Sequence, residues 1–185
     1  MDLKELLAAS NLNLSETQVS QADKYLNKIL QWNKTRNLVS RNLKKNDLAE
    51  HFLDCAVLHK HLLPGSVIDL GTGAGFPGIC LGIADPNREL TLLDSNRKKT
   101  SFLTHIKSEL GLRRVSVKNA RVEEIKQIKE KNIVCRAFKE PADLLKSLEN
   151  KISKENKIIL MVSEKRAFSA PGFEVEYKVS EASKI

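Results

Sequence analysis

The sequence contains few cysteines and no long apolar run, and these absences exclude several classes of protein. Its three cysteines, Cys55, Cys80 and Cys135, lie far apart and lack the spacing of metal ligands. This argues against a disulfide framework or a zinc site and fits a reducing cytosol. No apolar run approaches the roughly 18 residues of a membrane span, and residues 1–5 lack the charged-then-apolar pattern of a signal peptide. We therefore expect a cytoplasmic protein that needs no metal and does not enter a membrane.

The rest of the composition is that of an ordinary globular chain. Of the 185 residues, 41% are hydrophobic and 29% are charged. The sequence shows no internal repeat and no low-complexity tract. A chain of this length is long enough to bury a full core. We expect one folded unit that acts as a monomer.

Positive charge is concentrated in two stretches. Residues 24–45 contain seven Lys or Arg and no Asp or Glu, and residues 96–121 contain eight against the single Glu109. The two stretches together carry +14, so the rest of this +8 chain carries −6. They favour a surface that attracts a nucleic acid, whereas chance clustering of abundant lysines is the alternative. A membrane surface is disfavoured because neither stretch has a broad aromatic-rich apolar face.

Two kinds of hydrophobic periodicity divide the chain near residue 64. Before it the spacing is helical, with a capping-box pattern at residues 15–18, a helix ending near residue 33, a basic link over residues 34–46 and a second helix over about 47–62. After it, short apolar runs alternate with longer amphipathic stretches. The expected strands are residues 66–70, 89–94, 114–118, 132–135, 157–162 and 173–179. The expected helices are residues 77–84, 97–110, 122–128 and 141–148.

This alternation predicts an α/β fold with a doubly wound, mostly parallel, Rossmann-like sheet. Residues 64–185 would form the α/β domain. Residues 1–63 would form a helical extension that packs on this domain and does not fold independently.

The most informative segment is residues 69–78, which read DLGTGAGFPG. It follows the first expected strand and opens a helix, where a doubly wound sheet binds an adenosine-type cofactor. Glycine allows the sharp turn and the close approach of a ligand. A dinucleotide fingerprint needs glycines at relative positions 1, 3 and 6, but here they fall at 1, 3 and 5, and Phe76 occupies position 6. The pattern favours S-adenosylmethionine over NAD, and the lack of a Lys-Ser/Thr pair excludes a P-loop.

An acidic residue, Asp94, ends the next expected strand. A carboxylate at this strand end can accept hydrogen bonds from both hydroxyls of a ribose. A tight glycine turn followed by a helix-capping aspartate is the purely structural alternative. Because the glycine loop and Asp94 occur together at the expected spacing, we interpret them as one cofactor site.

The segment after the fourth expected strand should hold the reactive centre. It lacks the Asn/Asp-Pro-Pro-aromatic motif of enzymes that methylate exocyclic amines, and Cys135 lacks the preceding proline of cytosine-C5 chemistry. We interpret Cys135 as a buried structural cysteine. An acceptor that needs no strong base, such as guanine N7, fits catalysis by positioning and electrostatics, on a base in a loop or flipped out of its stack. Arg136 could orient the substrate or the cofactor carboxylate, or form a structural salt bridge.

Six ordered blocks between residues 32 and 162 resemble the bacterial glucose-inhibited division protein B, or RsmG, family of small-subunit rRNA methyltransferases. The blocks are Trp32-Asn33-Lys34 with Asn37-Leu38, His51-Phe52-Leu53-Asp54, residues 69–78, Leu92-Leu93-Asp94-Ser95, Arg121-Val122-Glu123-Glu124 and Arg136-Ala137-Phe138. The resemblance implies a class I methyltransferase that methylates N7 of a guanosine in the decoding-site loop of 16S rRNA. S-adenosylmethionine would be the donor and S-adenosylhomocysteine the product, with 16S rRNA or a small-subunit particle as the partner.

The resemblance also implies roles for individual residues. Gly71, Gly73 and Phe76 would line the cofactor, Asp94 would hold the ribose, Val122 and Glu123 would flank the adenine, and Arg136 would lie at the cofactor and active site. His51 and Asp54 would face the cleft, in either a catalytic or a packing role. The candidates for RNA contact, chosen from the basic stretches, are Lys34, Arg36, Lys44, Lys45 and Arg97.

Three other interpretations compete with this one. A small-molecule methyltransferase would leave the two basic stretches unexplained. An RNA-binding protein with an inactive pocket would not explain why the glycine loop and Asp94 occur together, and Phe76 disfavours an NAD-dependent oxidoreductase.

The family pattern also continues past a Glu-Arg-His-like stretch into a last strand. Residues 180–185 of this sequence read SEASKI and do not match that pattern, so we expect a final strand that is missing or very short.

Overall fold

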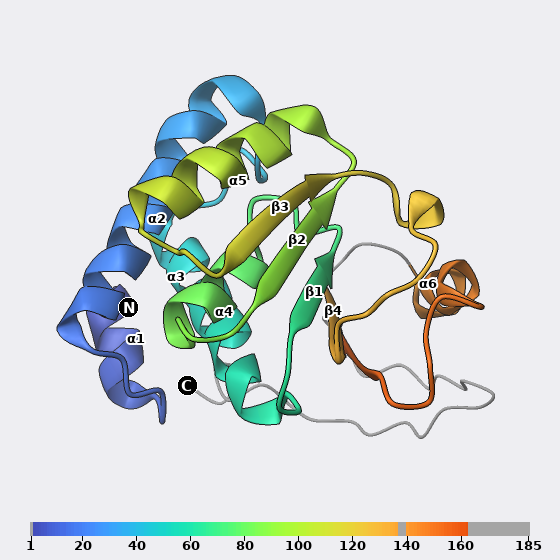
Figure 1. Cartoon of the computed structure of the whole chain (residues 1–185). Coiled ribbons are helices and arrows are strands. Elements are labelled where there is room, and N and C mark those ends of the chain that lie inside the picture. The colour runs from blue at the N-terminus through green and yellow to red at the C-terminus, as the bar shows by residue number, and fades with distance from the viewer. Residues whose placement is uncertain (1, 137–139, 163–185) are drawn as a thin grey trace.

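The computed structural model describes residues 2–136 and 140–162 (Figure 1). Three helices come first: α1 (Leu3–Ala9), α2 (Glu16–Arg36) and α3 (Lys45–Ala56), the last continued by the 3-10 helix η1 (Val57–His61). Among residues 2–136 and 140–162, no helix has both the length and the apolar character needed to cross a bilayer. The expected strand at residues 173–179 and the expected short or missing last strand lie outside the described residues.

The N-terminus of α2 is capped as predicted. Ser15 Oγ accepts from the Gln18 N–H at 3.3 Å, and Gln18 Oε1 accepts from the Ser15 N–H at 2.8 Å. The predicted end near residue 33 was wrong, because α2 continues to Arg36. Asn37, with φ of +49°, is what ends it. The second predicted helix, residues 47–62, is instead α3 followed by η1.

Five parallel strands form the sheet in the order β3-β2-β1-β4-β5. The strands are β1 (Val67–Leu70), β2 (Leu90–Asp94), β3 (Val115–Asn119), β4 (Asn132–Arg136) and β5 (Lys157–Met161). The connecting helices are α4 (Gly78–Ala84), α5 (Arg97–Glu109) and α6 (Pro141–Leu148), with the 3-10 helix η2 (Val122–Glu124) before β4. The doubly wound parallel fold is confirmed. A helix over residues 122–128 was wrong, since only the three residues of η2 are helical.

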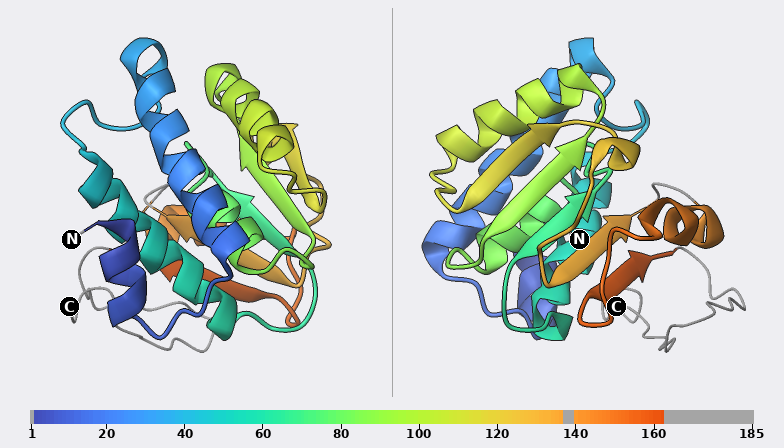
Figure 2. Two further views of the ribbon diagram at one scale, coloured as in Figure 1. Left: turned by 90° about the vertical axis from the view of Figure 1, so that its left-hand side faces the viewer. Right: turned by 45° about the vertical axis from the view of Figure 1, so that its right-hand side comes forward.

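Helices α1 to α5 cover one face of the sheet and α6 covers the other (Figure 2). Each face has its own core, because successive side chains of a strand point to opposite sides. In β1, Val67 belongs to the core under α1–α5, whereas Ile68 and Leu70 belong to the core under α6. Because β1 pairs parallel with both β2 and β4, the carboxyl ends of these three strands lie at one edge, and the strand order reverses direction at β1. This edge is where a doubly wound sheet binds ligands.

Helix α2 is joined to the sheet domain by side-chain hydrogen bonds as well as by apolar contacts. Gln18 Nε2 donates to the backbone oxygen of Ile83 at 2.7 Å, at the end of α4. Tyr25 is fully buried, and its hydroxyl donates to the backbone oxygen of Ala74 at 2.9 Å. The division of the chain at residues 63 and 64 stays a prediction.

Candidate cofactor and active site

The loop between β1 and α4 bends through three glycines in left-handed conformations. The φ angles of Gly71, Gly73 and Gly75 are +71°, +62° and +109°, a region that glycine enters without steric cost. The N–H groups of Gly71 and Thr72 both donate to the backbone oxygen of Leu93, at 2.9 and 3.1 Å. These bonds hold the loop against the carboxyl end of β2.

Asp94, the last residue of β2, faces this loop. Its Oδ2 accepts from the Gly73 N–H at 2.9 Å, and its Oδ1 accepts from the Asn96 N–H at 2.8 Å. The side chain is largely buried. Each carboxylate oxygen has a second lone pair beyond these bonds. The structure therefore places the predicted glycine loop and the predicted acid in direct contact, with acceptor capacity left over.

The glycines of the loop face different surroundings. A Cβ placed on Gly73 would meet nothing nearer than Gly71 O at 3.9 Å and Lys99 Nζ at 4.0 Å, so this glycine borders open space. A Cβ on Gly75 would lie 2.6 Å from Ile79 Cγ1, inside the packed core. Bare backbone that borders open space beside an acceptor carboxylate fits a ligand carrying a ribose. The residues present thus fit S-adenosylmethionine.

Arg136, at the end of β4, meets side chains from two other elements. Its Nη2 lies 2.7 Å from Nδ1 of His51 in α3, and its guanidinium carbon lies 5.7 Å from the centroid of the Phe76 ring. The Phe76 ring also lies 6.2 Å from that of His51 and 5.5 Å from that of Tyr25. Three predicted residues, far apart in the sequence, are therefore neighbours beside the glycine loop.

The other predicted residues near the cofactor follow β3. Asn119, which ends β3, pairs in register with Asp94, and its Nδ2 donates to the backbone oxygen of Asp94 at 3.0 Å. Val122 and Glu123 come three and four residues later, in η2. Val122 is buried and Glu123 is exposed. Both residues follow the carboxyl end of β3, which lies next to the carboxyl end of β2 where Asp94 is located.

Helices α2 and α5 run side by side in opposite directions. Gln21 Nε2 donates to the backbone oxygen of Leu110, just past the end of α5, at 2.7 Å. Further along α2, the Trp32 ring lies 5.3 Å from that of Phe102, in the first half of α5. The end of α2 therefore lies beside the start of α5.

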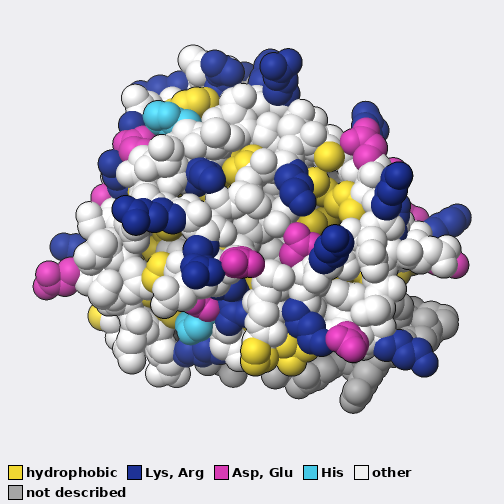
Figure 3. All heavy atoms as spheres, in the orientation of Figure 1, with side chains coloured by type: hydrophobic (Ala, Val, Ile, Leu, Met, Phe, Trp, Pro, Cys, Tyr) yellow, Lys and Arg dark blue, Asp and Glu magenta, His cyan; other side chains and the backbone are white. Residues whose placement is uncertain are grey.

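This arrangement brings parts of the two basic stretches together. Lys34 and Arg36 lie at the end of α2, and Arg97 starts α5 three residues after Asp94; all three are exposed. We call these three residues the basic end. Figure 3 shows Lys and Arg side chains at the top of the molecule, where Figure 1 places these two helix ends. Within the described residues, none of the three forms an ion pair.

The two remaining RNA candidates lie where α3 begins. Lys44 is exposed and precedes the first turn of the helix. Lys45 Nζ lies 2.7 Å from Asp23 Oδ1 in α2, so part of its charge is already balanced. Lys44 and Lys45 are therefore set apart from the basic end by the loop that follows α2.

A family model described as rRNA small subunit methyltransferase G matches residues 18–184. The chain belongs to this family. The resemblance expected from the six sequence blocks is therefore confirmed. Every residue of the site described above lies within the matched range.

Curated members of the rRNA small subunit methyltransferase G family show the extent of the likeness. The member from Chromobacterium violaceum is 37% identical over 162 residues, which cover 86% of this chain and 78% of the relative. The member from Halorhodospira halophila is 31% identical over 163 residues, covering 88% and 78%. The member from Nitrosomonas europaea is 42% identical over 116 residues, covering 62% of this chain and 54% of the relative.

Solved structures of other methyltransferases share the fold of this family member. A methyltransferase from Geobacter sulfurreducens has a TM-score of 0.57 at 16% identity and covers 74% of this chain and 69% of its own. Coclaurine N-methyltransferase, solved with N-methylheliamine and SAH, has a TM-score of 0.52 at 18% identity and covers 85% and 56%. At these identities the likeness shows the fold alone. The predicted class I methyltransferase fold is confirmed.

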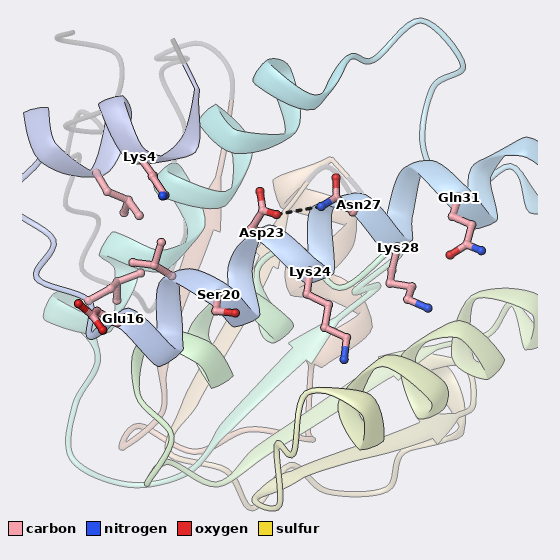
Figure 4. A pocket seen from close by; sticks show the side chains of 11 residues that line it. Lys4, Glu16, Ser20, Asp23, Lys24, Asn27, Lys28 and Gln31 are labelled. Carbon is pink, nitrogen blue, oxygen red and sulfur yellow. Dashed lines mark hydrogen bonds between the residues drawn. The ribbon is translucent and has the colours of Figure 1, made fainter.

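A groove between α1 and α2 lies apart from the glycine loop and Asp94 (Figure 4). Apolar side chains of Leu7, Leu14 and Val19 line it together with polar ones. Asn27 Nδ2 donates to Asp23 Oδ2 across one helical turn at 2.9 Å. None of the predicted cofactor residues lines this groove, and we assign it no role in the family's chemistry.

Two buried residues support the glycine loop in this member of the rRNA small subunit methyltransferase G family; sequence reasoning misses Tyr25 and includes Asp69 in the glycine segment without predicting its contact. The Tyr25 hydroxyl donates a hydrogen bond to the backbone oxygen of Ala74. Complete burial raises the pKa of this hydroxyl well above its usual value, so it keeps its proton and remains a donor. Asp69 Oδ2 accepts from the Gly78 N–H at 2.8 Å. The one signal for Tyr25 is its place on the apolar face of α2, three residues after Ala22.

Asp69 is fully buried at the centre of the sheet, where a charged carboxylate is costly. Burial raises its pKa to about 7. Hydrogen bonding with the Thr72 side chain and the Gly78 N–H lowers the pKa of Asp69, but not enough to reverse the effect of burial. Asp69 therefore exchanges its proton near neutral pH, directly beneath the loop.

Asp69→Asn should remove part of the pH dependence of stability. Between about pH 4 and pH 7 the folded chain keeps a proton on Asp69 that the unfolded chain has released, so wild-type stability falls as pH rises. Asparagine does not titrate and keeps an acceptor for Gly78. The variant's free energy of unfolding should exceed that of wild type by roughly 2–4 kcal/mol at pH 8, with little difference at pH 4. Urea unfolding across this range measures it, and parallel curves would contradict it.

Proposed function

We propose that this chain is a methyltransferase that transfers a methyl group from S-adenosylmethionine to N7 of a guanosine in the decoding-site loop of 16S rRNA. The observation that carries the proposal is the contact between Gly73 and Asp94, 2.9 Å long, at the carboxyl edge of the sheet. It lies within the range that matches the rRNA small subunit methyltransferase G family. The substrate would be 16S rRNA or a small-subunit particle, and S-adenosylhomocysteine the product.

The cofactor would lie across the glycine loop. Gly71 and Gly73 would approach it with backbone alone, and Asp94 would accept hydrogen bonds from its ribose with the lone pairs that Gly73 and Asn96 leave unused. Phe76 would line the cofactor beside the loop, and Val122 and Glu123 would flank the adenine. The Arg136 guanidinium would bind its carboxylate as a charge-assisted donor. When bound, S-adenosylmethionine supplies an electrophilic methyl group on a sulfonium.

The acceptor nitrogen needs little chemical help from the chain. The N7 lone pair of guanine is free at neutral pH, so neither a strong base nor a metal is required, and catalysis rests on positioning and electrostatics. Cys135 is buried in the core under α6, which supports a structural role rather than nucleophilic attack on a base. The target base would be unpaired or flipped out of its stack.

The basic end would hold the RNA backbone. Lys34, Arg36 and Arg97 are exposed at the carboxyl edge, close to where the cofactor would lie. Phosphate contacts by such side chains position a nucleic acid and make its affinity depend on salt. Lys44 and Lys45 would extend this surface along the start of α3. We further propose that the protein acts as a cytoplasmic monomer, which analytical ultracentrifugation at working concentration would test.

Arg36→Glu combined with Arg97→Glu should weaken RNA binding about tenfold or more at low salt. Each lost phosphate contact should also reduce the slope of log affinity against log salt by roughly 0.7–0.9. Arg113→Glu combined with Arg114→Glu is the matched control, because it reverses the same number of charges on residues that are exposed just before β3, at the opposite edge of the sheet. Filter binding with a decoding-site hairpin at several salt concentrations measures both values. Equal losses in the variant and the control would contradict the assignment of the basic end.

The proposed reaction is tested by incubating the protein with methyl-labelled cofactor and small-subunit RNA that lacks the modification. Labelled 7-methylguanosine in digested RNA, mapped to the decoding-site loop, is the expected result. Label in small molecules only would favour a small-molecule methyltransferase. RNA binding without cofactor binding would favour an RNA-binding protein with an inactive pocket, and either outcome would overturn the proposal.

A further inference from the structure

The contact between Arg136 and His51 fixes the state of the histidine ring. Arg136 Nη2 and His51 Nδ1 lie 2.7 Å apart. A guanidinium has only donors, so the imidazole nitrogen must accept. His51 therefore carries its proton on Nε2 and is neutral in this arrangement.

The guanidinium of Arg136 is held from two sides. Its edge meets His51, and its carbon lies 5.7 Å from the centroid of the Phe76 ring, a cation–π distance. His51 belongs to α3 and Phe76 to the glycine loop. The centroids of their two rings lie 6.2 Å apart. Since a free arginine side chain has many rotamers, two fixed contacts leave its remaining N–H groups pointing in a limited set of directions.

The charges around His51 also favour its neutral form. Burial lowers the pKa of His51, and the positive charge of Arg136 on β4 lowers it further. Asp54, Asp47 and Glu50, all on α3, act in the opposite direction without reversing the shift. At pH 7 the ring is thus able to accept the hydrogen bond from Arg136.

We propose that His51 is a positioning residue: its ring accepts a hydrogen bond that orients Arg136 toward the carboxylate of the bound cofactor. This inference rests on the proposed function. It assigns His51 no role as a general base, because its Nδ1 is occupied by Arg136 and the N7 acceptor has no proton to lose. The same contact explains why α3, outside the sheet, belongs to the cofactor site.

The acceptor role is tested by two substitutions that differ in one property. His51→Asn places an amide oxygen near the position of Nδ1, whereas His51→Leu offers no acceptor. Titration calorimetry with S-adenosylhomocysteine should show affinity about tenfold weaker for His51→Leu and within about threefold of wild type for His51→Asn. His59→Leu is the control, because His59 bonds the backbone oxygen of Ala56 in the turn after α3. Equal losses for the two His51 variants would overturn the proposal.

A double-mutant cycle tests whether His51 acts through Arg136. In an Arg136→Ala background, His51→Leu should cause no further loss of affinity, since the group it positions is already absent. Additive losses would show that His51 acts on its own and would overturn the proposal. If His51→Leu does not fold, the cycle is run with His51→Phe, and the pH comparison below decides independently.

The pH dependence separates this role from mere packing. Protonation of His51 removes the acceptor, so wild-type affinity should fall as pH drops through the lowered pKa of His51, whereas His51→Asn should not show this component. Both proteins retain Asp69, so its titration contributes equally to the two curves and cancels in their ratio. Identical pH profiles would overturn the proposal.

Imidazole 15N NMR of the protein without cofactor gives a readout that needs no methyl transfer. At pH 7 the His51 signals should show a proton on Nε2, and Arg136→Gln should raise the midpoint of their titration. A proton on Nδ1 would overturn the positioning role while leaving methylation of rRNA intact. Correct NMR behaviour with no methylation would instead overturn the proposed function alone.

Discussion

Gly75→Ala should lower the free energy of unfolding by about 2–6 kcal/mol. The φ angle of Gly75 is +109°, which an alanine adopts only with strain of about 1–3 kcal/mol. The new Cβ would also lie 2.6 Å from Ile79 Cγ1 and 2.9 Å from the Tyr25 hydroxyl, and crowding in a packed core costs about 1–3 kcal/mol more. Equilibrium unfolding in urea measures the change.

The matched control for this substitution is Gly111→Ala. Gly111 also has a left-handed φ, +69°, but a Cβ there would meet nothing within 4 Å. It should therefore show the backbone cost alone, about 1 kcal/mol. If the two variants lose equal stability, the loop is not packed on Tyr25 and Ile79 as tightly as the distances indicate.

Asp94→Ala should weaken binding of S-adenosylhomocysteine by about 30- to 150-fold, or roughly 2–3 kcal/mol. Alanine removes the acceptors for the ribose hydroxyls and also the bond that the Gly73 N–H donates to Asp94 Oδ2. The loss therefore combines missing ligand contacts with a loop that is less firmly held. Titration calorimetry measures the affinity, and thermal unfolding checks that the variant folds.

Two companion variants show which part of the carboxylate matters. Asp94→Asn keeps one oxygen acceptor and loses the charge, so its affinity should fall between those of wild type and Asp94→Ala. Asp85→Ala removes a carboxylate that pairs with Arg88 at 2.8 Å, outside the cofactor site, and should leave affinity unchanged. Full affinity in Asp94→Ala would remove Asp94 from the cofactor site.

Most of the fold could be predicted from the sequence because its elements carry local signals. Four of the five strands described are short, mainly apolar runs and β3 alternates apolar and polar residues at its start; each strand lies within one residue of its predicted position at either end. The glycine loop and Asp94 are likewise signalled locally, by residue type and by their position after a strand. Such signals need no knowledge of what lies across the fold.

The errors come from places where spacing is ambiguous. Val122, Ile125 and Ile128 repeat every three residues and so resemble a helix, but only η2 is helical. The N–H of Ile128 donates instead to the backbone oxygen of Lys151, at 2.8 Å. The end of α2 was predicted too early because the apolar stripe stops near Trp32. The polar residues that follow do not stop a helix, and α2 continues to Arg36.

The site contacts that sequence reasoning misses join distant parts of the chain. Tyr25 bonds Ala74, 49 residues away, and Arg136 bonds His51, 85 residues away. No periodicity within one sequence reports such pairs, since they depend on how α2 and α3 pack against the sheet. Sequence reasoning could name Arg136 and His51 separately, through family resemblance, but not their hydrogen bond.

Helix α2 would set a fixed distance between the proposed cofactor site and the proposed RNA surface. Tyr25 fixes one point of the helix beneath the glycine loop, and Arg36 ends it at the basic end. Eleven residues of helical rise separate the two points by about 16 Å. Inserting a single residue between them would rotate Arg36 by about 100° around the helix axis and lengthen the segment by about 1.5 Å, so the basic end would no longer face the same direction.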